Sequence, residues 1–360
     1  MSEVLKILIL SPSLNEEDNV SGISSLTKTL INSNKNVVYI PFIVGKKDAQ
    51  KRNLFWLLNL MLLPFRFCIV LSYKNIDWIH FNIGFEPFSL LRDFPLFLIA
   101  KMFRKKILLH VHGGRYVLAK PKALLLKILI HIFFKYSNSI LALSNKEKTA
   151  LVKNYNLCSN SVTVLPNGIS ISSLVELSEK SFISKLSILY LGRIDANKGL
   201  KEILAALEIL VAENLDFEFC VCGAGPQKDS FLFECRRILG DKLKYKGIVF
   251  GNLKQQVLKD SHIFLLPSYF EGLPISLLES MANYVVPIVT PVGSMPDVVQ
   301  SGENGFLVNG VDDIVNVIFE MSKNRDRLAQ IADNAARYVR KNYSMEEYVN
   351  RINKLYYENK

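Results

Sequence analysis

Short apolar runs of strand length alternate with helix-length segments along the chain, and the alternation occurs in two successive blocks. In the first half the expected strands are residues 6–10, 37–43, 78–81, 106–111, 140–143 and 162–165. In the second half they are residues 187–191, 217–222, 263–266 and 287–289. Strands that alternate with helices pair in parallel, and the helices cover both faces of the sheet. The pattern therefore predicts an α/β protein with two Rossmann-like domains, each built on a parallel sheet.

A turn-rich tripeptide, Pro166-Asn167-Gly168, precedes a serine-rich stretch and marks the expected boundary between the two blocks. A chain of 360 residues is also too long for one ordinary hydrophobic core and suits two domains. We expect the first domain over residues 1–168 and the second over 169–340. The last segment, 341–360, contains an amphipathic helix that follows the completed second domain.

The positive charge of the chain is confined to its first half. Residues 1–170 carry 22 Lys and Arg against 9 Asp and Glu, whereas residues 171–360 carry 22 against 24. The formal net charge of +11 therefore indicates a local anionic partner for the first domain. Nucleic acid is one candidate, but the sequence has no recognition motif or aromatic–basic platform for it. An anionic membrane surface is the other candidate.

Two apolar segments of the first half bear on that choice. Residues 54–71 are interrupted by Asn59, Pro64 and Arg66, so we expect a buried or interfacial helix rather than a transmembrane one. Residues 120–136 combine an apolar run with lysines. This combination is typical of a helix that lies on the surface of an anionic membrane. Alternatively, these helices pack the first domain and their lysines snorkel to solvent. Further basic clusters stand at residues 46–47, 51–52 and 104–106.

The N-terminus and the cysteines both indicate the cytoplasm. The opening MSEVLKILIL lacks the basic region of a signal peptide and runs directly into strand-like sequence. The cysteines are odd in number and have no ligand-like spacing, so buried, reduced core thiols are expected. They are Cys68, Cys158, Cys220, Cys222 and Cys235.

Residues 192–199 (GRIDANKG) lie between an expected strand and a long helix. A loop at the carboxyl end of a parallel strand is where this architecture binds ligands. Arg193 and Lys198 could neutralise a diphosphate there without a metal, Arg by paired hydrogen bonds and Lys as a point charge. A solvated charged loop is the alternative. A second glycine turn, GAGP at 223–226, is a weak signal, because a tight strand-to-helix turn explains it equally well.

The segment PSYFEGLP at 267–274 follows a strand and leads into the helix ISLLESMA. Glu271 stands just before this helix, and Glu279 stands about two turns along it. Free N–H groups at the helix N-terminus would face an anionic or sugar ligand. Carboxylates accept hydrogen bonds from sugar and ribose hydroxyls, so the pair suits a sugar nucleotide. In the alternative reading, one acid caps the helix and the other faces solvent.

The motifs GRIDANKG, GAGP and PSYFEGLP follow one another along the chain. In this order they resemble the motifs of the GT-B family of nucleotide-sugar glycosyltransferases known as family 4 or group 1 transferases. The resemblance covers the whole chain and is most specific over residues 186–310, which end in TPVGSMPDVVQSGENGFLV. It implies the GT-B fold, with two Rossmann-like domains that face a central cleft. The first domain would bind the acceptor and the second the donor, and the helix in 341–360 would pack back on the first. The implied activity is that of a retaining hexosyltransferase.

The resemblance also implies roles for individual residues of the second half. Arg193 and Lys198 match the clamp on the donor diphosphate, and Glu279 matches the glutamate that holds the nucleotide ribose. Glu271 matches the glutamate that contacts the transferred sugar. The spacing of the two acids is unlike a glycosidase pair, so Glu271 is not assigned as a nucleophile. The donor loop that follows it consists of Gly272, Leu273 and Pro274.

In the first half, His112 of HVHGG matches a histidine that faces the donor sugar, so His112 and Glu271 are the expected catalytic residues. His110, two residues earlier, is expected to be structural. Gly22 corresponds to the glycine-rich loop that approaches the donor phosphates.

The sequence departs from the family pattern in two places. The family has adjacent glycines near position 22, where this chain has Ser21 and Ile23 beside Gly22. Residues 283–287 (NYVVP) lack the glycine that precedes the proline in the family and contain one extra residue. A reshaped loop at 283–287 would bear on donor selectivity.

We expect neither metal nor cofactor, with a nucleotide-diphosphate sugar as co-substrate, because the DxD triad is lacking and Asp312-Asp313 is an adjacent pair in a helical context. The acceptor is expected to be a lipid-linked glycan of bacterial surface polysaccharide synthesis. The protein would then be cytoplasmic and peripheral on the inner face of the cytoplasmic membrane. Alternatives are a soluble enzyme that glycosylates a small molecule, a non-catalytic GT-B partner subunit and a sugar-nucleotide epimerase of the same fold. The sugar, nucleotide base, acceptor and oligomeric state do not follow from the sequence.

Overall fold

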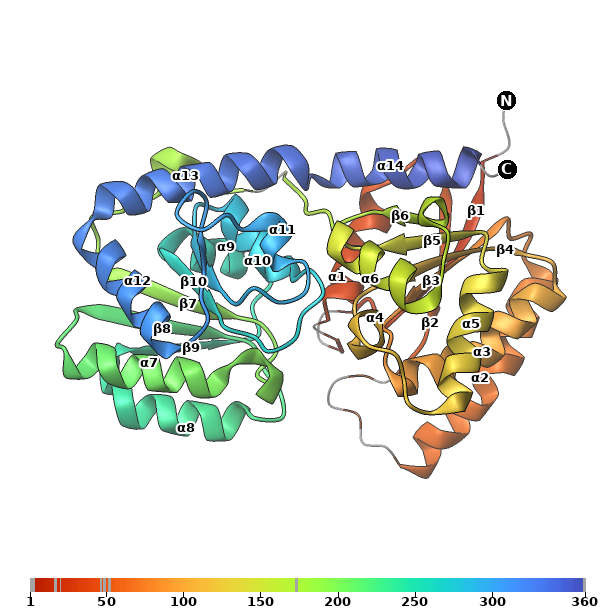
Figure 1. Ribbon diagram of the computed structural model, residues 1–360, viewed down its shortest axis with the longest axis horizontal. Helices are drawn as coiled ribbons and strands as arrows, with labels where there is room; N and C mark the ends of the chain where they lie inside the picture. The colour runs from red at the N-terminus through yellow and green to blue at the C-terminus, as the bar shows by residue number, and fades with distance from the viewer. Residues whose placement is uncertain are drawn as a thin grey trace. The chain divides into compact units, whose positions relative to one another are not determined.

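The computed structural model describes residues 4–15, 18–19, 21–45, 47, 50, 53–171 and 174–358, which form two compact units (Figure 1). The first unit comprises Met1–Gly168 together with Met345–Lys360, and the second comprises Ile169–Ser344. Each unit contains a six-stranded sheet of parallel strands covered by helices. The expected α/β class with two Rossmann-like domains is confirmed.

The first sheet has the strand order β2-β1-β3-β4-β5-β6, with every neighbouring pair parallel. Its strands are β1 Lys6–Ser11, β2 Val38–Ile43, β3 Trp78–Ile83, β4 Lys106–Val111, β5 Ser139–Ala142 and β6 Val162–Val164. The helices of this unit are α1 Gly22–Ser33, α2 Leu54–Tyr73, α3 Pro87–Met102, α4 Arg115–Leu118, α5 Leu124–Tyr136, α6 Asn145–Tyr155 and α14 Met345–Glu358, with a 3₁₀ turn at Ser159–Ser161.

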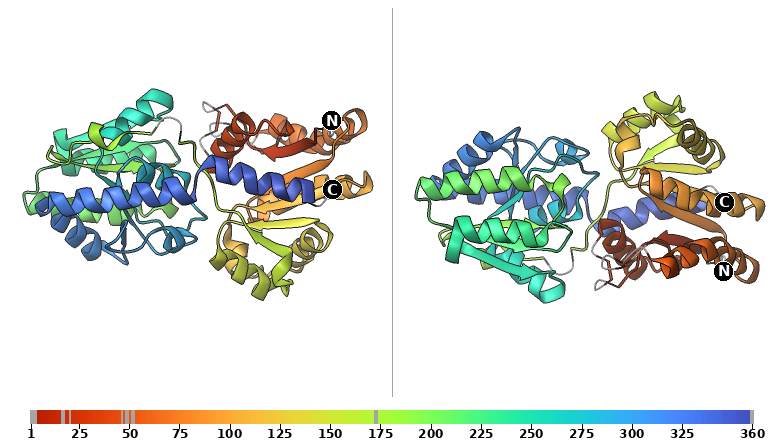
Figure 2. Two further views of the ribbon diagram at one scale, coloured as in Figure 1. Left: turned by 90° about the horizontal axis from the view of Figure 1, so that it is seen from above. Right: turned by 90° about the horizontal axis from the view of Figure 1, so that it is seen from below.

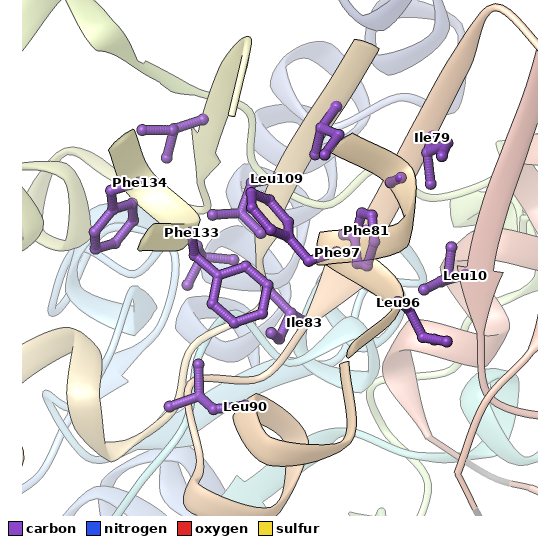
Figure 3. Close-up of a cluster of buried hydrophobic side chains, with 14 of the residues drawn as sticks. Leu10, Ile79, Phe81, Ile83, Leu90, Leu96, Phe97, Leu109, Phe133 and Phe134 are labelled. Carbon is purple, nitrogen blue, oxygen red and sulfur yellow. The ribbon is translucent and has the colours of Figure 1, made fainter. Parts of the chain in front are cut away.

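The two faces of the first sheet differ in chemistry. Leu10, Phe81 and Leu109 belong to an apolar core shared with α2, α3 and α5 (Figure 3). Because successive strand residues point to opposite sides, the residues between these face the other layer. That face carries the buried His80 and His110 and packs against α14.

Helix α2 forms where a helix was expected over residues 54–71, and it extends two residues further, to Tyr73. It is one continuous helix of 20 residues that passes through Pro64, and Asn59 and Arg66 do not end it. Asn59 Nδ2 instead donates to Phe55 O at 3.0 Å. Among the described helices, α2 alone is long and apolar enough to cross a membrane, judged by length and composition only.

The second sheet has the order β12-β11-β10-β7-β8-β9. Its strands are β7 Leu186–Leu191, β8 Phe217–Cys222, β9 Leu243–Gly247, β10 Ile263–Leu266, β11 Val286–Val289 and β12 Phe306–Leu307. The helices are α7 Leu200–Ala212, α8 Lys228–Leu239, α9 Gly251–Asp260, α10 Ile275–Ala282, α11 Met295–Val298, α12 Val311–Lys323 and α13 Arg325–Asn342, with 3₁₀ turns at Leu177–Glu179, Ala196–Lys198 and Gly240–Lys242. The two strands not expected from the sequence, β9 and β12, are the sheet edges, where strands are short or partly polar.

The last helix, α14, packs on the first unit (Figure 2). Trp78 Nε1 donates to Tyr356 O at 3.1 Å, and Asn34 Nδ2 donates to Asn353 Oδ1 at 2.8 Å. The expected boundary at residue 341 is corrected to Met345. The reason is that α13 continues to Asn342, and Ile169 N then donates to Tyr343 O at 2.9 Å.

The cysteines are free thiols, and Cys220, Cys222 and Cys235 are buried as expected. Cys220 and Cys222 lie on the same side of β8, with their sulfur atoms 3.8 Å apart. Cys158 is exposed, which corrects the expectation of core burial for that residue. It immediately precedes a surface 3₁₀ turn rather than lying within a strand.

Candidate functional site

The loops that follow β7, β10 and β11 interlock at the carboxyl edge of the second sheet. Gly199 has a φ of +68°, and a Cβ there would lie 1.9 Å from Pro267 O. Gly293 has a φ of +57°, and a Cβ there would lie 2.2 Å from Glu271 O. Only glycine fits at both positions, so the sequence brings three loops into direct backbone contact at this edge.

The interlocked loops place Lys198 against Glu271. Lys198 Nζ lies 2.5 Å from Glu271 Oε1, and Ser268 Oγ donates to the same oxygen at 2.9 Å. The Lys198 side chain is 22% exposed and that of Glu271 is 9% exposed. The pair is therefore sheltered from water, and the two side chains hold each other in place.

A second pair links Glu279 to the neighbouring helix α9. Lys254 Nζ lies 2.6 Å from Glu279 Oε1, and each side chain is about one-fifth exposed. Lys254 was not singled out from the sequence. It stands in a polar helix without a motif, and only the packing of α9 beside α10 reveals its partner.

Arg193 and residues 272–274, the expected donor loop, are held by backbone contacts. Arg193 is exposed, and its carbonyl oxygen accepts a hydrogen bond from Tyr190 Oη at 2.5 Å. Ile194 N donates to Ala224 O at 2.9 Å, so the GRIDANKG loop rests on the GAGP turn. Gly272 O accepts from Ser294 N at 2.9 Å. The donor loop continues through the buried Leu273 to Pro274, where α10 begins without a side-chain cap.

His112, directly after β4 in the first unit, has its tautomer fixed by Asn82. Asn82 Nδ2 donates to Leu10 O at 3.0 Å and lies 3.3 Å from Thr27 Oγ1. A carbonyl oxygen only accepts, so the amide nitrogen of Asn82 faces Leu10 and its Oδ1 faces His112 Nε2, 2.8 Å away. Nε2 therefore carries the proton and Nδ1 carries a lone pair. Loss of solvation lowers the pKa of His112 to about 3, so the ring is neutral near pH 7.

His112, which is half-buried, ends a row of imidazoles that reaches α14 through the buried His110 and His80. The ring centroids of His110 and His112 are 4.0 Å apart, and His80 Nε2 lies 3.3 Å from His110 Nδ1. His80 Nδ1 lies 2.8 Å from Tyr356 Oη. Burial lowers the pKa of His80 to about 3 and that of His110 well below its usual value, with a further contribution from the neighbouring imidazoles. His110 is wholly enclosed, as expected for a structural residue.

Gly22 is the first residue of α1 and is exposed. Ser21 caps the helix, and its Oγ accepts from Ser24 N at 3.3 Å. Gly22 is not among the residues with positive φ, so its backbone conformation does not require glycine. Gly22 and His112 thus belong to the first unit, whereas the other expected site residues gather at one edge of the second sheet.

The altered loop at 283–287 lies at the amino edge of the second sheet, because it joins the end of α10 to the start of β11. Tyr284 adopts a φ of +60°, and its ring lies under the Arg340 guanidinium with 4.7 Å between that group and the ring centroid. Asn283 Oδ1 accepts from Val175 N at 2.9 Å. Lys198 and Glu271 lie at the opposite edge of the sheet, so this loop does not form part of the site that they mark.

Residues 176–338 match the family described as "Glycosyl transferases group 1". The chain is a glycosyltransferase with the GT-B fold. The matched segment covers the whole carboxyl edge of the second sheet, including both lysine–glutamate pairs. The first unit of the transferase lies outside that segment.

Curated relatives of the transferase are glycosyltransferases. It is 23% identical over 262 residues to an Escherichia coli protein named UDP-Gal:alpha-D-GlcNAc-diphosphoundecaprenol alpha-1,3-galactosyltransferase, covering 68% of this chain and 67% of that protein. It is 26% identical over 276 residues to a 2-deoxystreptamine N-acetyl-D-glucosaminyltransferase of Niallia circulans, covering 68% of each chain. A putative colanic acid biosynthesis glycosyltransferase of Salmonella typhimurium is 26% identical over 51% of this chain and 48% of its own length.

Solved structures share the fold along nearly the whole transferase. HepE of Anabaena, crystallised with UDP-glucose, superposes with a TM-score of 0.75 at 16% identity, covering 98% of this chain and 99% of HepE. A sucrose-phosphate synthase of Thermosynechococcus elongatus superposes with a TM-score of 0.78 at 15% identity, covering 98% of both chains.

Proposed function

We propose that the protein transfers a sugar, with retention of anomeric configuration and without a metal, from a nucleoside-diphosphate sugar to a lipid-linked glycan. The observation that carries this proposal is the pairing of Lys198 with Glu271 at the carboxyl edge of the second sheet. One member suits a phosphate and the other a sugar hydroxyl. The E. coli relative is named for transfer to a diphosphoundecaprenol-linked acceptor, and HepE was crystallised with UDP-glucose, which supports both substrate classes.

In this proposal the donor diphosphate is held by Arg193 and Lys198. Their positive charges neutralise the negative charge that grows on the leaving phosphate, the task that a metal ion performs in other transferases. Lys198 turns from Glu271 toward the phosphate as the donor enters. The N-terminus of α10, which no side chain caps, adds partial positive charge at the same edge.

Two carboxylates then accept hydrogen bonds from the donor. Glu271 takes the hydroxyls of the transferred sugar once Lys198 has moved, and Glu279 takes the ribose hydroxyls. Lys254 fixes the position of the Glu279 carboxylate through their contact at 2.6 Å. Glu271 is not proposed as a nucleophile, because the spacing of Glu271 and Glu279 is unlike that of a glycosidase pair.

The first unit contributes His112 and Gly22 in this scheme. Because Nδ1 of His112 holds a lone pair, the imidazole accepts a hydrogen bond from a sugar hydroxyl and donates none through that atom. Gly22 offers the exposed N-terminus of α1 to the donor phosphates. The acceptor is proposed to reach the enzyme at the inner face of the cytoplasmic membrane, where the protein is peripheral.

The donor site is tested by calorimetry and thermal shift with UDP-, GDP-, ADP-, TDP- and CMP-sugars in the presence of EDTA. A donor at a hundredfold excess over its Kd should stabilise the protein by about 2.7 kcal/mol. Arg193→Ala should abolish this effect. The matched control is Arg236→Ala, an exposed arginine of α8, which should not change binding. Absence of binding by every donor would overturn the proposal in favour of a non-catalytic partner subunit.

A soluble small-molecule acceptor is the second candidate, because the Niallia relative is named for 2-deoxystreptamine. The two candidates differ in their acceptors and not in the donor site. Transfer assays with a polyprenyl-diphosphate glycan and with an aminocyclitol, each given the donor found by calorimetry, decide between them.

A further inference from the structure

The helical layer formed by α2, α3 and α5 is apolar on its outer side as well as its inner side. The inner side packs on the first sheet through three fully buried side chains, Phe67, Phe97 and Phe133. Figure 3 shows Phe97 and Phe133 within this core. The three helices are neighbours in the order α2, α3, α5 (Figure 1). Trp56 of α2 stacks on Phe88 of α3, with ring centroids 5.8 Å apart. The outer sides therefore form one continuous surface, which we call the three-helix face.

The side chains on this face are large and exposed. On α2 they recur one helical turn apart, so they line one side of the helix; Met61 is 70% exposed and Phe65 is 66% exposed. Leu91 and Met102 continue the face on α3, and Leu124 continues it on α5. Contiguous apolar surface of this extent on a soluble protein marks a site of interaction with a membrane or another protein.

The charges on the three-helix face have one sign. Within α2, α3 and α5, all of whose residues are described, Asp93 is the one carboxylate, and it is buried against Arg92 with 2.6 Å between Oδ1 and Nε. The exposed charged side chains on these helices include Arg66, Lys127 and Lys135. An apolar surface whose exposed charges are all positive complements the interface of a bilayer that contains anionic lipid.

The packing of α2 suits a position along such a surface rather than across it. Leu63, Phe67 and Leu71 on its inner side are buried in the core of the first unit. Phe67 also makes an edge contact with Phe42, with ring centroids 5.0 Å apart. Crossing the membrane would remove these three side chains from the sheet and expose the core that they cover.

We infer that the three-helix face inserts into the boundary between headgroups and acyl chains of an anionic phospholipid bilayer, with α2, α3 and α5 lying parallel to the membrane. Membrane binding would give the enzyme access to a lipid-linked acceptor, and this part of the inference rests on the proposed function. Vesicle binding itself does not depend on the sugar chemistry. The basic segments at Lys46 and at residues 51–52 lie outside the described residues and take no part in the argument.

Vesicle flotation of the full chain tests the inference. The protein should float with vesicles of phosphatidylcholine mixed with phosphatidylglycerol, less with phosphatidylcholine alone, and less as salt is raised. Trp56 reports insertion directly, because the other tryptophan, Trp78, is buried in the first unit. Brominated phosphatidylcholine should quench the wild-type fluorescence, and the quenching should disappear in Trp56→Phe. An unquenched Trp56 would overturn insertion.

Phe65→Glu should reduce vesicle partitioning about tenfold or more, because it places a charge in the inserted surface. The matched control is Phe233→Glu on α8 of the second unit, where the phenylalanine is 65% exposed. Lys127→Ala and Lys135→Ala should each weaken binding about fivefold. Equal losses in Phe65→Glu and Phe233→Glu would overturn the inference. It would also fail if the chain self-associated in sedimentation experiments and Phe65→Glu abolished both that association and flotation, since the face would then join two copies.

Donor calorimetry on Phe65→Glu separates this inference from the proposed function. Intact donor binding with lost flotation supports the three-helix face. Flotation of a wild-type protein that binds no donor also supports the face, while the proposed transfer activity fails.

Discussion

Asn82 Oδ1 lies 2.8 Å from His112 Nε2, and the amide nitrogen of the same asparagine donates to Leu10 O. These contacts join β1, β3 and the end of β4 through one side chain. They settle which nitrogen of His112 carries a proton, which the sequence motif HVHGG alone does not specify.

Asn82→Leu should remove the constraint on the tautomer while keeping similar volume. If His112 accepts from a sugar hydroxyl, kcat/KM should fall about tenfold to a hundredfold, with a larger effect on kcat than on donor Kd. Nitrogen-15 NMR of the histidine rings should show the Nδ1 of His112 losing its unprotonated signature, with His112→Gln assigning the resonance. An unchanged NMR signature together with lower activity would contradict a positioning role for Asn82.

Glu271→Gln should lower kcat about a hundredfold to a thousandfold and leave donor Kd within a few fold. The amide keeps the shape of the side chain but loses the charge that holds Lys198 and accepts sugar hydroxyls. Steady-state kinetics combined with calorimetry separates the two quantities. Glu208→Gln, on α7 of the same unit, is the control and should retain activity, because Glu208 pairs with Arg237 on the surface. A large loss of donor affinity with normal kcat would assign Glu271 to donor binding instead.

Lys254→Ala should weaken donor binding about tenfold, because Glu279 loses the cation that positions it. Lys254→Arg should recover much of the affinity. The control lies on the same helix: Lys259 pairs with Glu179 at 3.1 Å, and Lys259→Ala should leave donor binding unchanged. Titration calorimetry measures all three variants. Equal affinity in wild type and Lys254→Ala would show that Glu279 is positioned without its partner.

The first unit should lose stability in acid. His80 and His112 have folded pKa values of about 3, against about 6.5 in an unfolded chain, because burial disfavours the charged ring. The stability due to neutral burial is therefore fully present above about pH 6.5 and is lost as the pH falls toward 3. At pH 5 the loss is roughly 2 kcal/mol per histidine.

Urea unfolding followed by tryptophan fluorescence at pH 7.5 and pH 5 measures this effect, since both tryptophans belong to the first unit. His80→Gln should flatten the pH dependence. His131→Gln, at an exposed position of α5, should leave it unchanged. If the free energy of unfolding had the same pH dependence in His80→Gln as in the wild type, His80 would not be a source of the acid instability.

Much of the second unit follows from the sequence because its signals are local. The strands 217–222 and 263–266 were predicted to the residue, since buried parallel strands read as short continuous apolar runs. The edge strand β9 is partly polar and has no continuous apolar run, so it was not predicted. Lys198 and Glu271 were both named from motifs, but their direct contact depends on the close approach permitted at Gly199 and Gly293.

The sequence by itself determined the α/β class, the order of the elements and the identity of most candidate site residues. The reason is that strand length, helical spacing and loop motifs all depend on residues close together in the sequence. Tertiary structure alone decided that Lys254 meets Glu279, that Asn82 orients His112 and that α2, α3 and α5 join their exposed apolar sides. Each of these relationships joins residues from different elements. Their distance in space depends on sheet order and helix packing, which no local pattern records.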